Sequence, residues 1–508
     1  MKKLFTFLFV AATAIAARAT DYTVPITVTV NGVTSEQTGV ITIVENDGLY
    51  DLTMKNFMLQ SADGPMGVGT VEMKGMKPCQ DGEATLLLSD ETITITSGDD
   101  PGVAFWMASI LPPVPVDLRA KIEGERLRCY IDIDLMASLG QVIQVAIGDG
   151  YQMPNASFEA WHTSTGSYVE PNGWHSFESA TGTLAALAGH HIEKSDDAHS
   201  GDASARIFAT SIFGIVANGT MTTGCMNAGS MSASDTQNHA FLDTSMTELD
   251  GKPFLDGNGD PFYIPLCSRP DSVALWVKFS QGKANASHPY ATISAVITDG
   301  TYYQDPEDKT YTNVVARAKD NQIATTGGQW VRISAPFVYT DNEVSPQAVL
   351  ITISTNADAG QGSANDEVLV DDIAFIYNAK VSGISIKGVE VPEFNAETTD
   401  YEMEIDKEIT ADDIEVVTDG KAANIARTVT VEDGTYVCNI AAIGGDMSAK
   451  QSYVVKVKSA LSTICDLPTA AGQSAAYFTL DGRQAKTLVT GKIYICRQTD
   501  GTVSKIRQ

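Results

Sequence analysis

The stretch 273-VALWVKF-279 alternates between two kinds of side chain with a period of two. Successive side chains of an extended chain point to opposite faces, so one face of this stretch is entirely apolar. The opposite face carries Trp276 and Lys278. This pattern is typical of a β-strand whose apolar face packs on a core.

The stretch 330-WVRIS-334 repeats the arrangement, with Trp330 and Arg332 on one face and Val331 and Ile333 on the other. Aromatic faces beside hydrogen-bonding side chains are suited to sugar rings. The predicted carbohydrate-binding residues are therefore Trp276, Lys278, Trp330 and Arg332, together with Tyr302 and Tyr303, which stand in a polar loop nearby in the sequence. The alternative is that both faces of these strands are covered, each Trp lying under a basic side-chain stem.

The whole chain favours β-structure. It has 508 residues, enough for several domains, and only 19% of them are charged. Thr, Ser, Gly and Val are plentiful. We expect an all-β protein with a calycin-like β-barrel, a β-jelly-roll and an immunoglobulin-like β-sandwich in tandem.

The N-terminus predicts export. Lys2 and Lys3 precede an apolar run, and Ala17-Arg18-Ala19 has the small-x-small form of a cleavage site. We expect a signal peptide at residues 1–19 and no transmembrane segment, since the apolar run is short for a bilayer. The net charge of −29 repels phosphate backbones and anionic lipids. Nucleic acid is therefore not an expected partner.

Residues 20–150 alternate with period two between turn residues such as Asn46-Asp47-Gly48. The segments 47-DGLYDLTMKNFML-59, 112-PPVPVDLRAKI-122 and 131-IDIDLMASLGQVIQVAIGDG-150 resemble the calycin-like (lipocalin-like) domain of secreted Bacteroidetes proteins. The resemblance implies a small β-barrel. Such a barrel either holds an apolar ligand or is filled by its own side chains.

Residues 151–378 contain an ordered series of motifs: NASFEAW, PNGWHSF, HSGDASARI, VALWVKF, GGQWVRISAPFVY and VLVDDIAFIYN. This series resembles the carbohydrate metabolism domain of gut Bacteroidetes, which is similar to the β-jelly-roll of carbohydrate-binding modules. The resemblance implies that the first and last strands, near residues 156–162 and 368–376, lie side by side.

The same resemblance implies a structural calcium ion, held by Glu159 with Asp371 or Asp372 and joined by carbonyl groups of 199-HSGD-202. Carboxylate and carbonyl oxygens are the ligands that calcium prefers. The alternative is that these acids bind loop amides without a metal. The segment 256-DGNGD-260 begins like an EF-hand loop, but Pro261 and Cys267 stand where Gly and Glu are required, so we expect a hairpin tip.

The C-terminal part divides into three segments. Residues 379–458 resemble immunoglobulin-like or cadherin-like modules, through Gly388, Phe394-Asn395, Tyr401 and Tyr453. Small and polar residues at 459–475 predict a linker. Residues 476–508 are basic and resemble the C-terminal sorting domain of Bacteroidetes secretion, through Asp481-Gly482-Arg483 and Asp500-Gly501. This resemblance implies surface-delivery machinery as a partner.

Taken together, these features predict an exported protein, in the periplasm, at the cell surface or outside the cell, that binds a polysaccharide or other glycan through residues 151–378. A glycoside hydrolase built on the jelly-roll is one alternative. A carrier of a small apolar ligand in the barrel is another. No nucleophile elbow, HExxH motif, P-loop or GxGxxG motif is present, so the sequence does not predict catalytic residues.

Overall fold

The computed structural model describes residues 18–60, 64–162, 169–212, 214–248, 250–340, 343–405, 407–458, 464–466, 476–489, 492–497 and 503–507. Its regular structure is almost all β, as expected, and its helical elements are single turns: η1 Met107–Ser109, α1 Met136–Leu139, α2 Ala185–Ala188 and η2 Ala411–Asp413. Among these residues, no helix has the length and hydropathy needed to cross a bilayer. The expected signal peptide lies outside the described residues except for Arg18 and Ala19, which begin β1.

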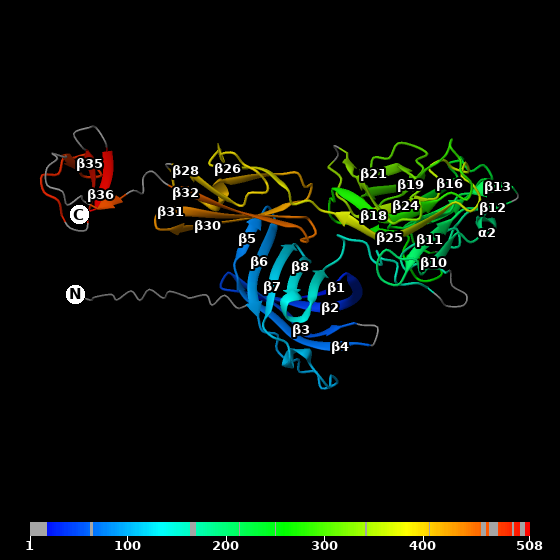
Figure 1. Ribbon diagram of the computed structural model, residues 1–508, viewed down its shortest axis with the longest axis horizontal. Helices are drawn as coiled ribbons and strands as arrows, with labels where there is room; N and C mark the ends of the chain where they lie inside the picture. Colours follow the sequence, from blue (N-terminus) through cyan, green and yellow to red (C-terminus); the bar gives the residue numbers. More distant parts are fainter. Residues whose placement is uncertain are drawn as a thin grey trace, which may run out of the picture. The chain divides into compact units, whose positions relative to one another are not determined.

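The N-terminal part is one curled nine-stranded sheet, drawn in blue to cyan in Figure 1, with the order β4-β3-β2-β1-β9-β8-β7-β6-β5. Its strands are β1 Arg18–Val30, β2 Val33–Asn46, β3 Leu49–Leu59, β4 Met66–Met76, β5 Pro78–Asp81, β6 Ala84–Ile93, β7 Val114–Glu123, β8 Arg126–Leu135 and β9 Gln141–Ile147. Just after β6 the chain returns to β4, where Thr70 and Thr96 exchange two backbone hydrogen bonds. This pairing helps the sheet to close on itself.

Two-residue turns set the register of the first hairpins. Asn31-Gly32 and Asp47-Gly48 have positive φ at both positions, which is the conformation of a type I′ turn. The expected turn at Asn46-Asp47-Gly48 is thereby confirmed. One face of the curled sheet carries a continuous apolar cluster that includes Ile26, Ile41 and Leu118.

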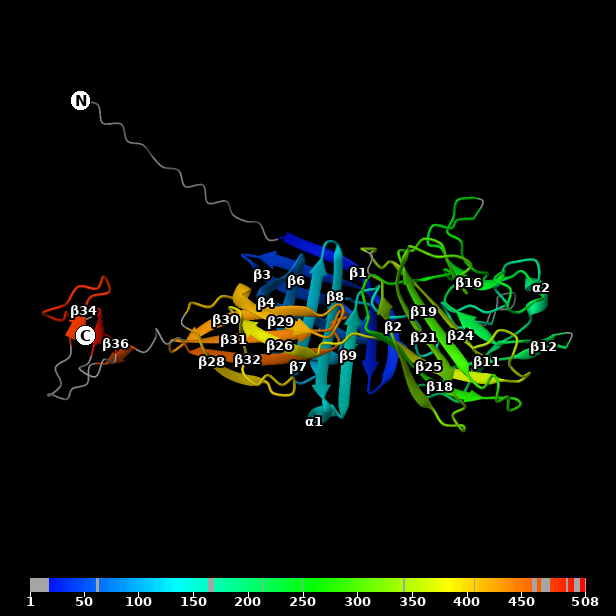
Figure 2. The ribbon, with the colours of Figure 1, turned by 90° about the horizontal axis from the view of Figure 1, so that it is seen from above.

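Residues 151–377 form a β-sandwich, drawn mainly in green in Figures 1 and 2. Its first sheet has the order β10-β11-β25-β18-β22, and these strands are β10 Ile192–Ser195, β11 Ser204–Phe208, β25 Glu367–Ile376, β18 Ser272–Ser280 and β22 Val331–Pro336. The apolar face expected for residues 273–279 is confirmed, because all four of its apolar side chains are buried. In β22, by contrast, Val331 is 41% exposed, because this strand lies at the edge of the sheet.

The second sheet of the sandwich has the order β14-β24-β19-β21-β23, and β17 also pairs with β24. Its strands are β14 Thr220–Thr222, β17 Ile264–Pro265, β19 Ala291–Thr298, β21 Val314–Ile323, β23 Val338–Tyr339 and β24 Ala348–Ser354. A small third sheet has the order β15-β16-β20, with β15 Cys225–Ala228, β16 Asn238–Leu242 and β20 Tyr303–Asp305. A separate hairpin consists of β12 Thr210–Ile212 and β13 Ile215–Ala217.

The expected pairing of residues 156–162 with residues 368–376 is corrected in one respect. Residues 156–162 form no continuous strand, because Asn155 and Phe158 adopt positive φ in a turn. They still lie beside β25, whose Ile373 donates a backbone hydrogen bond to the Ala156 carbonyl at 3.0 Å. The strand neighbours of β25 are instead β11 and β18.

A second compact unit comprises residues 378–444 and 449–508. Its first part is a β-sandwich with sheet orders β27-β26-β29 and β28-β32-β31-β30 around a shared apolar core. The strands are β26 Val381–Ile386, β27 Val389–Glu390, β28 Asp400–Glu404, β29 Ile414–Thr418, β30 Asn424–Glu432, β31 Thr435–Ile443 and β32 Lys450–Lys458. The buried Tyr453 donates its hydroxyl to the Ala396 carbonyl at 3.0 Å.

The last described segments form a small sheet with the order β33-β36-β35-β34. Its strands are β33 Ile464–Asp466, β34 Ala476–Phe478, β35 Ile493–Arg497 and β36 Val503–Arg507. The expected linker at 459–475 is corrected at residues 464–466, which pair with β36 in parallel. The rest of that linker lies outside the described residues, and the expected tail is described only in part.

Candidate functional site

One face of the second sandwich sheet carries a cluster of hydroxyl groups. Period-two alternation places Thr292 and Ser294 on the same face of β19, while the residues between and beyond them are buried in the core. In the register, Thr292 lies opposite Ser354, Ser294 lies opposite Thr352, and Thr220 of β14 lies on the other side of Ser354. Directly opposed residues share a face of the sheet. We call these five residues the hydroxyl cluster: Thr220, Thr292, Ser294, Thr352 and Ser354.

Further along the same strands this face becomes apolar. Val296 of β19 lies opposite Leu350 of β24, and both are buried. They pack with Leu242 of β16 and Tyr303 of β20, which belong to the small third sheet. The small third sheet therefore covers the apolar part of this face. The hydroxyl groups lie on the part beside that cover, where a hollow opens.

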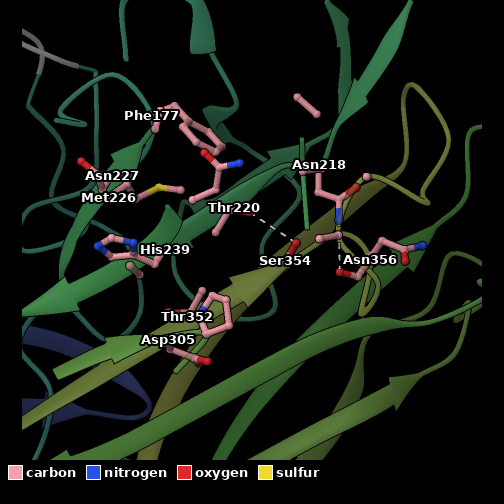
Figure 3. Close-up of a pocket in the computed structure, with 18 of the residues that line it drawn as sticks. Phe177, Asn218, Thr220, Met226, Asn227, His239, Asp305, Thr352, Ser354 and Asn356 are labelled. Carbon is pink, nitrogen blue, oxygen red and sulfur yellow. Dashed lines mark hydrogen bonds between the residues drawn. The ribbon is translucent and has the colours of Figure 1, made fainter. Parts of the chain in front are cut away.

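The hollow beside the hydroxyl cluster has a volume of about 370 Å³. Figure 3 shows Thr220, Thr352 and Ser354 together with Phe177 and other residues that line it. Further lining residues include Met226, Asn227, His239, Asp305 and Lys319. The volume falls within the range of about 300–1,000 Å³ that is common for small-ligand sites.

Hydrogen bonds hold the polar lining in place. The Thr220 hydroxyl donates to Ser354 Oγ at 3.3 Å, and the Thr292 hydroxyl donates to Asn321 Oδ1 at 2.7 Å. The Asn218 amide donates to the carbonyls of Asn356 and Asp358. These groups are positioned before any ligand arrives, and each hydroxyl oxygen can still accept a hydrogen bond.

The expected aromatic face is assembled, but the protein's own side chains cover it. The His199 ring stacks on Trp276, with ring centroids 3.8 Å apart and an interplanar angle of 15°. The Lys278 ammonium lies 4.9 Å from the Trp330 ring centroid and forms an ion pair with Asp197 at 2.6 Å. The ring faces that would stack on a sugar are therefore occupied, as in the covered alternative.

Of the other expected sugar-binding residues, Arg332 lies beside Trp276, whereas Tyr302 and Tyr303 lie elsewhere in the sandwich. Arg332 is exposed on the edge strand, opposite Trp276 in the register. Tyr303 is buried, and its hydroxyl donates to Glu307 Oε1 at 3.1 Å, so its ring is not available to a ligand. Tyr302 is 36% exposed, and its hydroxyl lies 3.4 Å from Nε2 of His239, which lines the hollow. Tyr302 is thus the expected residue that lies beside the hydroxyl-lined site.

The three acids expected to hold calcium surround the loop at residues 197–203. Glu159 Oε1 accepts from the Asp202 and Ala203 amides at 2.8 and 3.1 Å. Asp371 Oδ2 accepts from the backbone amides of His199 and Ser200 at 2.8 and 3.2 Å. Both oxygens of Asp372 also have partners in this loop.

Asp372 Oδ1 accepts from the Ser200 hydroxyl at 2.8 Å, and Oδ2 lies 2.6 Å from His199 Nδ1. Burial, and next the charge of Asp372, raise the pKa of the fully buried Asp371 to about 7. Among the described residues, Glu159, Asp371 and Asp372 do not bring one oxygen each within 4.8 Å of the others. The loop's own donors bind each of these acids, and calcium at this place stays a prediction.

The sequence contains a signal for the hydroxyl cluster. In 291-ATISAVIT-298 and 348-AVLITIS-354, Thr and Ser recur at alternate positions between buried aliphatic residues. A polar face in an otherwise apolar strand points to solvent or to a ligand. The pattern alone could not distinguish the two, because much of the wall of the hollow comes from residues 177–240, and further parts of it from residues 305–306, 319 and 356–360.

Comparisons with solved structures identify distant likenesses. A candidate glycoside hydrolase from Bacteroides thetaiotaomicron VPI-5482 aligns with a TM-score of 0.33 and 13% identity, covering 64% of this chain and 88% of that one. A carbohydrate-binding module of the β-sandwich superfamily aligns with a TM-score of 0.20 and 9% identity, covering 59% of this chain and 93% of that one. Among curated proteins, none matches this chain. Residues 19–147 match the family model of the calycin-like beta-barrel domain, so the chain carries such a domain at its N-terminal end.

Proposed function

We propose that this protein binds carbohydrate in the hollow on the second sandwich sheet. The observation that carries the proposal is the hydroxyl cluster, which places five Ser and Thr side chains from three adjacent strands on one face. Sugar hydroxyls both donate and accept hydrogen bonds, and so do the hydroxyl groups of Ser and Thr. A preformed set of such groups loses little conformational entropy when a ligand binds.

The walls of the hollow supply the apolar contacts that a sugar ring also needs. Phe177 and His239 provide rings, and Met226 provides a flexible thioether side chain. Lys319 and Asp305 place one charge of each sign at the site, so the lining has no strong preference for charged ligands. The ligand that fits best is a neutral glycan, in agreement with the strongly negative net charge of the chain.

The two alternative functions have weaker support. The usual glycosidase mechanism needs a pair of carboxyl groups about 5–9.5 Å apart. Among the described residues that line the hollow, Asp305 is the only acid. A carrier function would need empty space inside the N-terminal barrel. The face of the curled sheet that carries the apolar cluster is instead packed with side chains. Together with glycan binding, we propose export and delivery to a cell surface, which residues 1–19 and 476–508 led us to expect.

Replacing Thr352 with Val tests the proposed site. The substitution removes one hydroxyl group from the hydroxyl cluster and keeps the shape and the strand preference of the side chain. One neutral hydrogen bond contributes about 0.5–1.5 kcal/mol, so we expect glycan affinity to fall about 2- to 12-fold. A neutral-glycan array with the full chain identifies the probe, and calorimetry of the best-bound glycan gives the dissociation constants.

Thr430→Val is the matched control, because Thr430 is exposed on β30 of the second unit. This variant should bind the glycan as the unchanged protein does. Trp330→Ala tests the expected aromatic face in the same assay. If Trp330→Ala abolishes binding and Thr352→Val has no effect, the sugar binds at the first sheet and the proposed site is wrong.

A further inference from the structure

Three buried polar atoms in the sandwich face one another without hydrogen-bond partners. They are Glu170 Oε2, His175 Nδ1 and Asp256 Oδ2. The side chains of Glu170 and His175 are 0% exposed, and that of Asp256 is 1% exposed. A buried polar atom without a partner costs about 1–3 kcal/mol, so three in one place need a physical explanation.

The second polar atom of each residue is anchored, and this fixes the direction of the unpaired one. Glu170 Oε1 accepts from the Ser176 amide and hydroxyl and from the Ser179 hydroxyl. Asp256 Oδ1 accepts from the amides of Asn258 and Asp260 at 2.9 and 2.8 Å. Each carboxylate therefore uses one oxygen to hold its own loop and presents the other to the shared point.

The histidine is oriented in the same way. His175 Nε2 lies 3.1 Å from the Pro261 carbonyl oxygen, and a carbonyl can only accept, so Nε2 carries a proton. In the neutral ring Nδ1 then presents a lone pair. Metal-binding histidines commonly donate their other N–H group to a carbonyl in this manner. Phe262 packs against the ring, with centroids 4.5 Å apart, and limits its rotation.

The spacing of the three atoms suits a single ion. His175 Nδ1 lies 4.0 Å from Glu170 Oε2 and 3.5 Å from Asp256 Oδ2, and one ligand atom from each residue lies within 4.8 Å of the others. These separations exceed the 2.7–3.2 Å of well-formed hydrogen bonds. An ion among three atoms so spaced can lie about 2.0–2.4 Å from each, which is the range of metal–ligand bonds to nitrogen and oxygen.

We propose that Glu170, His175 and Asp256 bind a divalent transition-metal ion, with zinc as the best candidate. An imidazole nitrogen with two carboxylates suits zinc, whereas calcium takes ligand sets made of oxygen. The burial of all three ligands points to a structural ion. This site is separate from the acids around residues 197–203, and it does not depend on the proposed glycan site.

The ion would connect segments that are distant in the sequence. Asp256 stands at the start of 256-DGNGD-260, where the bridge between Leu255 and Pro261 confirms the expected hairpin tip. The EF-hand interpretation fails, yet the first acid of the loop joins two residues from 170–175. Asp260 reinforces the connection, because its Oδ2 accepts from the Gly173 amide at 2.7 Å.

Zinc binding by the purified full chain tests the proposal. Protein stripped with a chelator and dialysed is titrated with zinc, and bound metal is counted by mass spectrometry. We expect about one zinc ion per chain and, at saturating zinc, a melting temperature about 5–10 °C higher in tryptophan fluorescence. Cobalt in place of zinc should give a visible absorption spectrum that reports its ligands.

Asp256→Asn is the informative variant, because the amide oxygen can still accept from the turn amides while the anionic ligand is lost. It should lower zinc affinity at least about 10-fold. Asp358→Asn is the matched control, since Asp358 lies 2.6 Å from His288 in a partly exposed acid–histidine pair of the same domain. The control should bind zinc as the unchanged protein does.

Calcium is titrated in parallel, so that the two sites can be told apart. Calcium uptake that is lost in Glu159→Gln and retained in Asp256→Asn would belong to the other acids and would leave the zinc result unaffected. Less than about 0.1 zinc ion per unchanged chain at saturation overturns the proposal. So does equal zinc affinity in Asp256→Asn. If Asp256→Asn does not fold, zinc binding by the unchanged protein alone decides whether the proposal holds.

Discussion

A side chain at Gly201 would collide with Glu159, whose carboxylate holds the loop at residues 197–203. Gly201 has a φ of +64°, and a Cβ atom at this residue would lie 2.0 Å from Glu159 Oε1. Glu159 can move aside only by giving up its hydrogen bonds to the Asp202 and Ala203 amides. We therefore expect Gly201→Ala to destabilise the sandwich by about 2 kcal/mol or more, measured by urea unfolding with tryptophan fluorescence.

Gly327→Ala separates the two causes, because Gly327 has a φ of +63° and no atom within 4 Å of its would-be Cβ. It carries the backbone strain without the collision, so it should cost less than Gly201→Ala. Equal losses in the two variants would show that Glu159 is not a firm anchor of the loop.

At the residue scale, the sequence showed which acids lie together but not what they bind. Glu159, Asp371 and Asp372 do surround one loop, as the paired motifs implied. Their partners are amides, a hydroxyl and His199, and the backbone path of residues 197–203 decides this. Local patterns do not contain that path. For the same reason, adjacent tyrosines could not be divided into the buried Tyr303 and the half-exposed Tyr302.

At the element scale, the single-turn helix η2 in the second unit depends on one acid. Asp413 Oδ2 accepts from the amide and the hydroxyl of Thr410, both at 2.8 Å, and the bond from the amide is part of a capping box. The Lys387 ammonium lies 2.9 Å from Asp413 Oδ1. The hydrogen bond from Lys387, followed by those from Thr410, lowers the pKa of Asp413 to about 2.

A lowered carboxyl pKa stabilises the folded state above the ordinary value of 3.8, and this contribution disappears as pH falls towards 2. Asp413→Asn should therefore lower the melting temperature of the second unit at pH 6, and the difference should vanish near pH 2. Calorimetry of the full chain measures this, with Asp412→Asn as a control for the change in charge. A constant difference from pH 6 to pH 2 would refute the capping role.

Also at the element scale, alternation predicted the strands and their inward faces but not what covers the outward ones. It correctly placed residues 273–279 on a core. It could not show that β15, β16 and β20 cover one half of the second sheet and leave the hydroxyl cluster beside a hollow. Strand β20 joins that cover by pairing with residues more than 60 positions away, as in the pairing of Leu242 with Tyr303. Similarly, Glu170, His175 and Asp256 have no motif in common and meet only in the folded sandwich.

At the scale of the whole molecule, the charge balance governs stability in salt. The chain has 63 acidic and 34 basic residues, so its net charge is −29 at pH 7. Self-repulsion of this size opposes the compact state, and salt screens it, since the Debye length falls from about 30 Å at 0.01 M to about 3 Å at 1 M. We expect the melting temperature at pH 7 to rise between 0.01 and 0.5 M sodium chloride.

The control is the same titration near pH 4.5, the isoelectric point, where the net charge is close to zero and the rise should be absent. Potassium chloride should give the same curve as sodium chloride, because screening depends on ionic strength and not on the identity of the cation. A melting temperature that falls with salt at pH 7 would mean that ion pairs such as Arg206 with Glu367 outweigh the repulsion, and the argument from net charge would then fail.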